Sequence, residues 1–255
     1  MKELYNYRQM IYSLVKKDLR GRYKGSALGF LWTFVNPLLQ LMVYTVVFSV
    51  ILRTNIDKYY LHLFVALIPW IFFSSAITGG SSSIIAQKDL IKKIYFPREV
   101  IPIAYVTSCF GNMLLLFIVI FFVIAFSGVH FGLAALAGLP VIMIVEYLLA
   151  LGMAMLTSAV TVYFRDLEHI LGIVTMAWMY MTPVMYTIDI VPERFRTVFK
   201  LNPMTPVIQA YRDVLYFSRM PKITTLTEAF VLGIIFLGIG VLTFSKLKKH
   251  FAEEL

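Results

Sequence analysis

Few residues of this chain have the type and spacing that catalysis or metal binding requires. The histidines are scattered and lack the spacing of metal ligands. They are His62, His130, His169 and His250. No set of Ser, His and Asp indicates a nucleophilic site, and the phosphate-binding pattern G-x-x-x-x-G-K-[ST] does not occur. The sequence therefore predicts no catalytic residue, no metal site and no cofactor in this chain.

Glu146 and Cys109 stand out because each lies inside a long apolar run. A lone charge at the centre of a bilayer is costly unless it is paired or hydrated. Glu146 is therefore either a proton or substrate contact, or a neutral group that hydrogen-bonds a neighbouring helix. Since further buried charges are absent, a proton relay is disfavoured and energy must come from outside the chain. Cys109 is the only cysteine, so it can form no intramolecular disulfide, and we expect a small buried apolar side chain.

The elements that must position these residues are membrane spans. Of 255 residues 60% are hydrophobic, which is more apolar surface than a water-soluble domain can bury. A span needs about 20 apolar residues to cross a core about 30 Å thick. Six runs qualify: Phe30–Leu52, Leu61–Ile77, Val100–Phe126, Leu133–Val162, Ile170–Ile188 and Ala229–Ser245. We predict one all-α integral membrane domain over 1–255, with a bundle of six transmembrane helices over 30–245.

The basic residues predict the orientation of these spans. An even number of crossings places both termini on one side, and most of the 23 Lys and Arg residues flank the spans on that side. Because basic flanks remain in the cytoplasm, both termini are predicted to be cytoplasmic. The Lys and Arg residues stand beside spans and do not form a domain, so the net charge of +9 does not indicate binding of nucleic acid.

The N-terminal segment, 1–24, predicts an amphipathic helix. Leu4, Ile11 and Leu14 share one arc of a helical wheel with other apolar residues, while basic residues lie opposite. Such a helix lies in the membrane interface with its basic side toward anionic headgroups. A plain charged flank is the alternative. Arg8, Asp18 and Arg22 interrupt the pattern, so we expect the helix to break or to contact another protein there.

Residues 87–99, QKDLIKKIYFPRE, predict a short basic helix between the second and third spans. It ends before Pro97, because proline forces the preceding residue out of helical geometry. A simple connector needs fewer residues and no apolar side chains such as Leu90, Ile94 and Tyr95. The segment therefore favours docking of a soluble partner.

The segment 189–228, between the fifth and sixth spans, contains two amphipathic pieces separated by Asn202-Pro203. They predict two short re-entrant or gate helices that dip into the outer face or cap it. Helices that do not span are tolerated at that depth when they line a cavity or pack against protein.

Aromatic residues and small residues recur within the spans. Aromatic side chains near span ends form interfacial belts, whereas those at mid-depth are able to line a conduit, since flat rings bind the apolar faces of sugars. Ala150, Ala154 and Ser158 form a stripe of small residues that predicts close helix packing.

Several strings, in this order and spacing, resemble the ABC-2-type permeases that export polysaccharides and polyol phosphates. The first is RGRYKGSALGFLW at positions 20–32, followed by Asn36-Pro37. The others are Phe164-Arg165-Asp166, Thr182-Pro183-Val184 and Asn202-Pro203. The resemblance covers essentially the whole chain.

The resemblance implies a homodimer of six-span permeases paired with two copies of a separate ABC ATPase, which holds the ATP and Mg²⁺. It implies transport, not catalysis, by this chain: export of a lipid-linked polysaccharide, such as an O antigen or teichoic acid, across the bacterial cytoplasmic (inner) membrane. The partners are then the ATPase, a second copy, the lipid-linked glycan and membrane lipids. In that family 1–24 would be the interface helix, 87–99 the coupling helix, and the pieces within 189–228 the gate helices.

The expected site residues fall into three groups. Coupling to the ATPase is expected at Lys88, Asp89, Leu90, Lys92, Lys93, Arg165 and Asp166. The substrate channel is expected at Tyr44, Trp70, Phe73, Trp178 and Tyr186. Headgroup binding is expected at Arg20, Arg22, Lys24 and Arg98, where an orientation signal or phospholipid contact is the alternative.

Two rival functions differ in what they require. An ABC-2 exporter of a drug or small lipid needs a closed pocket, whereas a polymer exporter needs a wide continuous path. An integral-membrane transferase acting on lipid-linked sugars needs paired carboxylates or a metal-binding Asp cluster at a membrane face. Asp89, Asp166 and Glu168 do not form such a cluster in the sequence.

Overall fold

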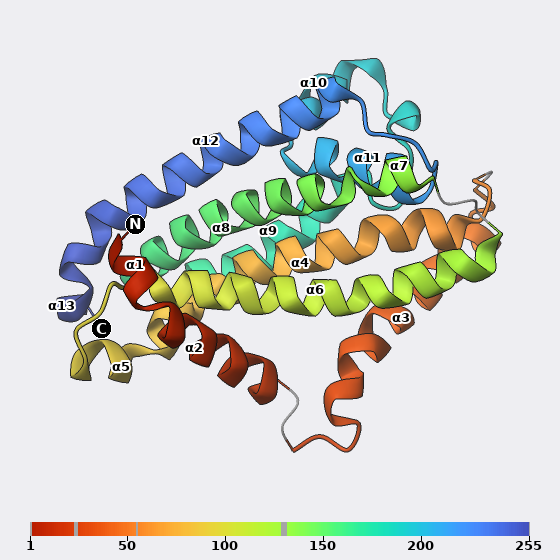
Figure 1. Cartoon of the computed structure of the whole chain (residues 1–255). Helices are drawn as coiled ribbons and strands as arrows, with labels where there is room; N and C mark the ends of the chain where they lie inside the picture. The colour runs from red at the N-terminus through yellow and green to blue at the C-terminus, as the bar shows by residue number, and fades with distance from the viewer. Residues whose placement is uncertain (1, 23–24, 55, 129–131, 255) are drawn as a thin grey trace.

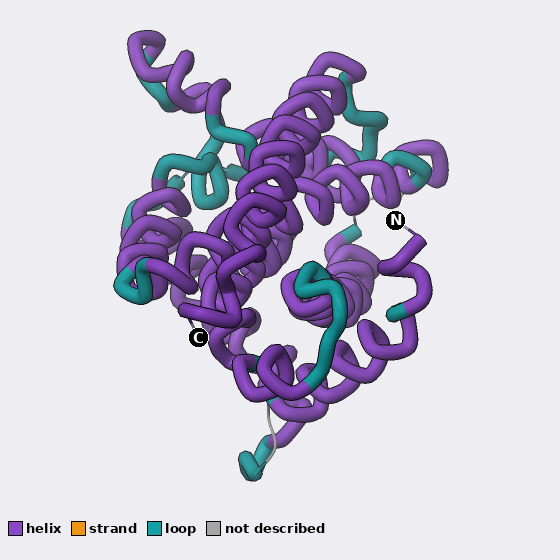
Figure 2. Tube along the Cα trace, turned by 90° about the vertical axis from the view of Figure 1, so that its left-hand side faces the viewer, coloured by secondary structure: helices purple, strands orange, loops and turns teal. Residues whose placement is uncertain are grey.

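The structure is a computed structural model that describes residues 2–22, 25–54, 56–128 and 132–254, and its described residues include no β-strand (Figure 1). The α-helices are α1 (Lys2–Asn6), α2 (Arg8–Gly21), α3 (Trp32–Thr45), α4 (Tyr59–Ala86), α5 (Lys88–Lys93), α6 (Val100–Ser127), α7 (Leu133–Leu136), α8 (Leu139–Tyr163), α9 (Leu167–Tyr180), α10 (Glu193–Leu201), α11 (Met204–Leu215), α12 (Ile223–Leu247) and α13 (Phe251–Glu254). Figure 2 shows them as a bundle of helices joined by short loops. The predicted all-α class is confirmed.

Among the described residues, five helical stretches are long and apolar enough to cross a membrane. They are Gly29–Ile51, Tyr59–Lys93, Val100–Ser127, Leu139–Tyr163 and Ile223–His250. The fourth begins at Leu139 and not at Leu133 as predicted, since Pro140 occupies the first turn of α8, where its missing N–H has no cost. The last begins at Ile223, six residues before the predicted start, because its polar first turn is still helical.

The fifth predicted span, Ile170–Ile188, is not one continuous helix. α9 ends at Tyr180, and its 14 residues extend about 21 Å, which is less than a bilayer core of about 30 Å. Pro183 lacks a backbone N–H and disfavours helical geometry for the residue before it. The prediction of helix beyond Tyr180 is therefore wrong.

Two side chains from the α11 region satisfy the backbone groups that this break exposes. The amide nitrogen of Asn202 donates to the carbonyl of Met181 at 3.0 Å. The guanidinium of Arg212 donates to the carbonyls of Val184 at 2.7 Å and Tyr186 at 3.1 Å. α11 is almost wholly buried, so it lies within the bundle and not on its surface. Buried contacts of this kind are what permit irregular backbone at membrane depth.

α8 and α12 approach each other closely at two glycines. A Cβ on Gly240 would lie 2.0 Å from the carbonyl oxygen of Gly152, and a Cβ on Gly152 would lie 2.5 Å from the backbone of Leu237. Ala154, from the predicted stripe of small residues, packs against α4, where a Cβ on Gly80 would lie 3.0 Å from the alanine methyl. Small residues thus let α8 contact α4 on one face and α12 on another.

Both chain ends lie at the same end of the bundle (Figure 1). The N and C markers, α5 and α13 lie at this end, which we call the α5 end, while α7, α10 and α11 lie at the opposite end, the α11 end. An even number of crossings requires this arrangement of the termini. Which end faces the cytoplasm stays a prediction from the basic flanks.

The predicted N-terminal helix over 1–24 is interrupted at Tyr7, between α1 and α2. On its apolar arc, Leu4, Ile11 and Leu14 pack against a buried cluster formed by α4, α5, α6, α8, α12 and α13. The arc therefore contacts protein over part of its length. The location of this helix in a membrane interface stays a prediction.

Gly240→Ala is expected to lower the thermal unfolding temperature of the detergent-purified protein. The added Cβ would overlap the Gly152 carbonyl, and forcing packed helices apart costs about 1–3 kcal/mol. Gly238→Ala is the matched control, because a Cβ there has no atom within 4 Å. Equal unfolding temperatures for the two variants would contradict the close contact of α8 and α12.

Candidate functional site

The predicted coupling segment forms a prominent surface at the α5 end. Lys88, Asp89, Lys92 and Lys93 of α5 are exposed. Leu90 is half-buried and Ile91 is buried, so the apolar side of this short helix is attached to the bundle. The helix is thus anchored by its apolar side and presents four charged side chains at the surface of this end of the bundle.

Tyr95, two residues after the end of α5, is an exposed residue that the expected coupling group does not include. Its side chain is 96% exposed, while the adjacent Phe96 is buried and holds the backbone in place. A fully exposed tyrosine on a rigid segment is typical of a binding surface, since aromatic residues supply much of the energy of protein interfaces. The string IYFP contained this signal as a run of apolar residues in a polar connector.

A polar groove of about 820 Å³ lies beside this surface, between α1, residues 91–99 and the C-terminal lysines. Arg98 donates to the carbonyl of Lys248, and Glu99 forms an ion pair with the ammonium of Lys248. Arg98 is therefore engaged in fastening the end of α12 to the start of α6. To bind a lipid headgroup, the role expected from the sequence, Arg98 would have to give up this bond to the Lys248 carbonyl.

Arg165 and Asp166, the second group of expected coupling residues, are exposed in the turn between α8 and α9. The hydroxyl of Tyr163, just before this turn, donates to the carbonyl of Leu247 at 2.8 Å. This bond attaches the turn to the end of α12, which lies at the α5 end. The structure thus places both expected coupling groups at the same end of the bundle.

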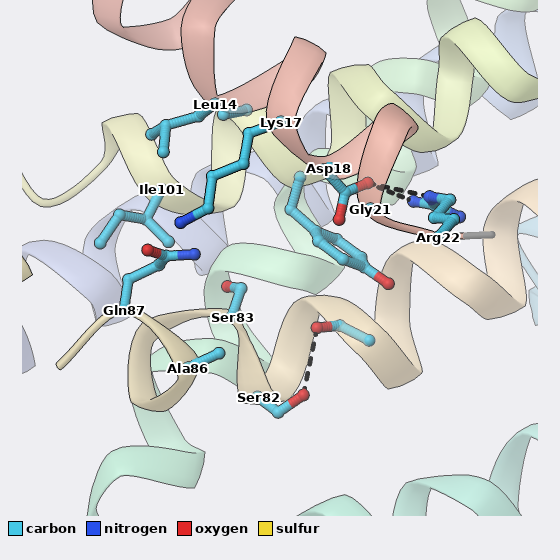
Figure 3. Close-up of a pocket in the computed structure, with 13 residues that line it drawn as sticks. Leu14, Lys17, Asp18, Gly21, Arg22, Ser82, Ser83, Ala86, Gln87 and Ile101 are labelled. Atoms are coloured by element: carbon cyan, nitrogen blue, oxygen red, sulfur yellow. Dashed lines mark hydrogen bonds and ion pairs between the residues drawn. The ribbon is translucent and has the colours of Figure 1, made fainter. Parts of the chain in front are cut away.

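A pocket of about 440 Å³ lies between α2, the end of α4 and the start of α6 (Figure 3). Figure 3 shows the Lys17 ammonium near Gln87 on one side and the pair of Asp18 and Arg22 on the other. The remaining lining is mostly apolar or small, and it includes Ser82. The pocket therefore combines a cation with an apolar wall, which is suitable for the polar head and first carbons of an amphiphile.

Asp18 and Arg22 interrupt the amphipathic pattern of α2 because they bind α6. The guanidinium of Arg22 donates to the Asp18 carboxylate at 2.9 Å and to the sulfur of Cys109 at 3.1 Å. The hydroxyl of Ser108 donates to the same carboxylate. Burial by itself lowers the pKa of Arg22, but the neighbouring Cys109 and Asp18 raise it by more. The pKa of Arg22 therefore lies above its ordinary value, and the guanidinium is charged. Arg22 is thus part of the joint between α2 and α6 as well as of the pocket wall.

The other expected headgroup residues are placed differently. Arg20 is exposed on α2. Lys24 lies outside the described residues, as does His130 among the histidines. Lys17 lines the pocket together with Arg22. The sequence placed Lys17 on the polar side of the predicted helix but did not include it among the expected headgroup residues.

Three of the five aromatic residues expected in a channel form one packed cluster. The ring of Phe73 contacts the rings of Trp70 at 5.8 Å and Trp178 at 5.3 Å between centroids. Trp70 and Phe73 are buried inside the chain, so they face neighbouring side chains and not open space. Trp178, Tyr44 and Tyr186 are partly exposed. The structure therefore separates two buried supporting rings from three rings at the surface of the bundle.

Glu146 is completely buried on α8 and accepts a hydrogen bond from the hydroxyl of Tyr211 on α11 at 2.6 Å. Of the two readings left open by the sequence, this geometry favours the hydrogen-bonded interhelical group. Arg212, the next residue on α11, was not among the expected site residues. Its charge, next to that of Asp213 in a helix rich in apolar residues, was a signal of a buried polar contact.

Asp18→Ala is expected to raise the rate at which a maleimide labels Cys109, the only thiol in the chain. Loss of the carboxylate frees Arg22 and loosens α2 from α6, and a weakening of 1.4 kcal/mol would raise the rate about tenfold. Lys17→Ala, an exposed position on the same helix, is the control. A labelling rate that Asp18→Ala leaves unchanged would contradict the proposed joint.

Comparison with known proteins places this architecture in a family. Residues 9–216 match the family model described as ABC-2 type transporter. An O-antigen export system permease protein of Myxococcus xanthus is 32% identical over 257 residues, which cover 100% of this chain and 98% of that protein. One of Klebsiella pneumoniae is 35% identical over 242 residues, covering 95% and 93%.

A more distant relative is the polysialic acid transport protein of Escherichia coli, which is 20% identical over 236 residues and covers 90% of each chain. Each of these three relatives matches over 90% or more of its own length and of this chain. The family model covers the part of the chain from α2 to α11. The resemblance inferred from short strings of the sequence is thereby confirmed. This chain belongs to the ABC-2 type transporter family of membrane proteins.

Proposed function

We propose that this chain is the permease subunit of an ABC exporter that moves a lipid-linked polysaccharide, such as an O antigen or a related glycan, across the bacterial cytoplasmic membrane. The observation that carries the proposal is the similarity, over 93% or more of each chain, to proteins named O-antigen export system permeases. The chain itself is a transport protein of this family, and ATP hydrolysis takes place on a partner ATPase, which holds ATP and Mg²⁺.

The ATPase is proposed to bind at the α5 end, which then faces the cytoplasm. The exposed charges of α5, the turn with Arg165 and Asp166, and the protruding Tyr95 supply a surface for it. Two ATPase copies would bind two copies of this chain. Closure of the ATPase dimer would then move α5, and the bonds from Arg98 and Glu99 to Lys248 would carry that movement to α12.

The lipid-linked substrate is proposed to enter at the pocket between α2, α4 and α6. Its phosphate would approach Lys17 and Arg22 in the pocket wall and Arg20, which is exposed on the same helix as Lys17, while the first carbons of the lipid would contact the apolar wall. The glycan would then pass along a channel between two copies of the chain, lined in part by the half-exposed rings of Tyr44, Trp178 and Tyr186. Trp70 and Phe73 would support Trp178 from inside the bundle.

Deletion of the gene should abolish the strain's surface polysaccharide and cause lipid-linked glycan to accumulate inside the cell. Extraction of both fractions and gel staining measures the effect, and expression of the wild-type chain should restore export. Normal surface polysaccharide in the deletion strain would reject a glycan substrate. Altered drug resistance in that strain would favour the small-molecule exporter.

Charge reversal at both Lys92 and Lys93 should reduce binding of the ATPase and its stimulation by the permease. Both side chains are exposed on α5, and the change alters the docking surface by four units of charge. Arg194→Glu with Lys200→Glu, on α10 at the α11 end, is a matched double reversal. Unchanged co-purification and coupled ATPase activity in the α5 variant would contradict docking at this helix.

A further inference from the structure

A second pocket, at the α11 end, has no role in the function proposed so far. Its volume is about 320 Å³, and it lies between the start of α4, the loop after α9, α11 and the start of α12. This volume falls within the range of ligand sites, about 300–1,000 Å³. We call it the α11 pocket.

Two buried polar atoms in the lining of the α11 pocket have no hydrogen-bond partner among the described residues. They are Nδ1 of His62 and Nε of Arg212, whose residues are 1% and 5% exposed. The terminal nitrogens of Arg212 already bind the carbonyls of Val184 and Tyr186, so Nε is the group that remains. An unsatisfied buried polar group is unfavourable, because it has lost its hydrogen bonds to water. Both residues line the pocket, so a bound molecule that reached these enclosed atoms would supply the missing hydrogen bonds.

The charges around the α11 pocket are of both signs. Arg212, Arg219 and Lys222 contribute positive charge, while Asp189 and Asp213 contribute negative charge, and Arg219 donates to Asp213 at 2.7 Å. A phosphate or carboxylate would have to approach these two carboxylates. A neutral molecule that both donates and accepts hydrogen bonds meets groups of both kinds.

An aromatic ring and an amide complete the lining. The ring of Phe217 is 51% exposed, and Gln209 is the one partly exposed residue of the otherwise buried α11 between Met204 and Leu215. A flat apolar ring beside an amide, a guanidinium and a carboxylate suits a sugar, whose ring has an apolar C–H face and a rim of hydroxyl groups. The hydroxyls donate to carboxylates and accept from Arg212 and Gln209.

We infer that the α11 pocket binds a sugar unit of the glycan at the end of the permease opposite the ATPase. The source of the sugar rests on the proposed function, whereas the pocket itself rests on the geometry of this chain. A sugar bound there would contact Arg212, the residue that fastens the broken segment after α9 to α11. Occupancy would therefore stabilise the arrangement of α9 and α11.

The test is binding of a defined probe to the permease–ATPase complex in lipid nanodiscs. The probe is a set of water-soluble oligosaccharides released from the surface polysaccharide of the source strain, and isothermal titration calorimetry measures its affinity. Gln209→Ala and Phe217→Ala should each weaken binding about tenfold, since each removes about 1.4 kcal/mol of contact. Neither change removes the bonds of Arg212 to the backbone, so both variants should fold.

Phe195→Ala is the control, because Phe195 is a similarly exposed phenylalanine, 47%, on α10 that does not line the pocket. Equal affinity in the wild type and both pocket variants would overturn the proposal. So would absence of binding by the wild type, or binding of inorganic phosphate that the oligosaccharides do not displace.

Surface polysaccharide in the deletion strain, measured separately, distinguishes the two proposals. Loss of export on deletion, with oligosaccharide affinity unchanged in the pocket variants, would leave the export function standing and reject the sugar site. Export that is independent of this chain, with oligosaccharide binding lost in the variants, would reject the export function and support the sugar site.

Discussion

A lipid bilayer offers no hydrogen-bond partner to a polypeptide, and the structure of this chain depends on that constraint. Where the chain is one uninterrupted helix, the backbone satisfies itself. Where α9 stops at Tyr180, other side chains must do so. Asn202 donates to the carbonyl of Met181 and, at 2.9 Å, to the hydroxyl of Thr182, while Arg212 binds two carbonyls further along. These bonds allow the chain to leave helical geometry after Tyr180 and to pack the buried helix α11 against the segment that follows.

The same constraint explains where charges occur. Within the bundle, Glu146 is hydrogen-bonded to Tyr211, and Asp18 and Arg22 pair with each other against α6. Unpaired cations such as Lys92 and Lys93 are found at the α5 end, where water is available. Paired charges therefore lie inside the bundle, whereas exposed charges lie at its two ends, as Lys92 on α5 and Arg194 on α10 do.

α11 connects the interior of the bundle with the α11 pocket. Two consecutive residues serve this purpose: Tyr211 reaches Glu146 of α8, and Arg212 reaches the loop after α9 and the pocket lining. Because both contacts are buried, a displacement of α11 would have to break them together. A ligand in the pocket and a movement of α8 therefore act on the same short helix.

Hydropathy alone determined the helical class and five of the spans, because the length of an apolar run is a local property. Short strings of residues were sufficient for the family. The break in α9, the joint formed by Asp18 and Arg22, the burial of Trp70 and Phe73, and the α11 pocket were decided by tertiary structure. Each depends on residues far apart in the chain, such as Thr182 with Asn202 or Arg22 with Cys109, and only packing brings them within bonding distance.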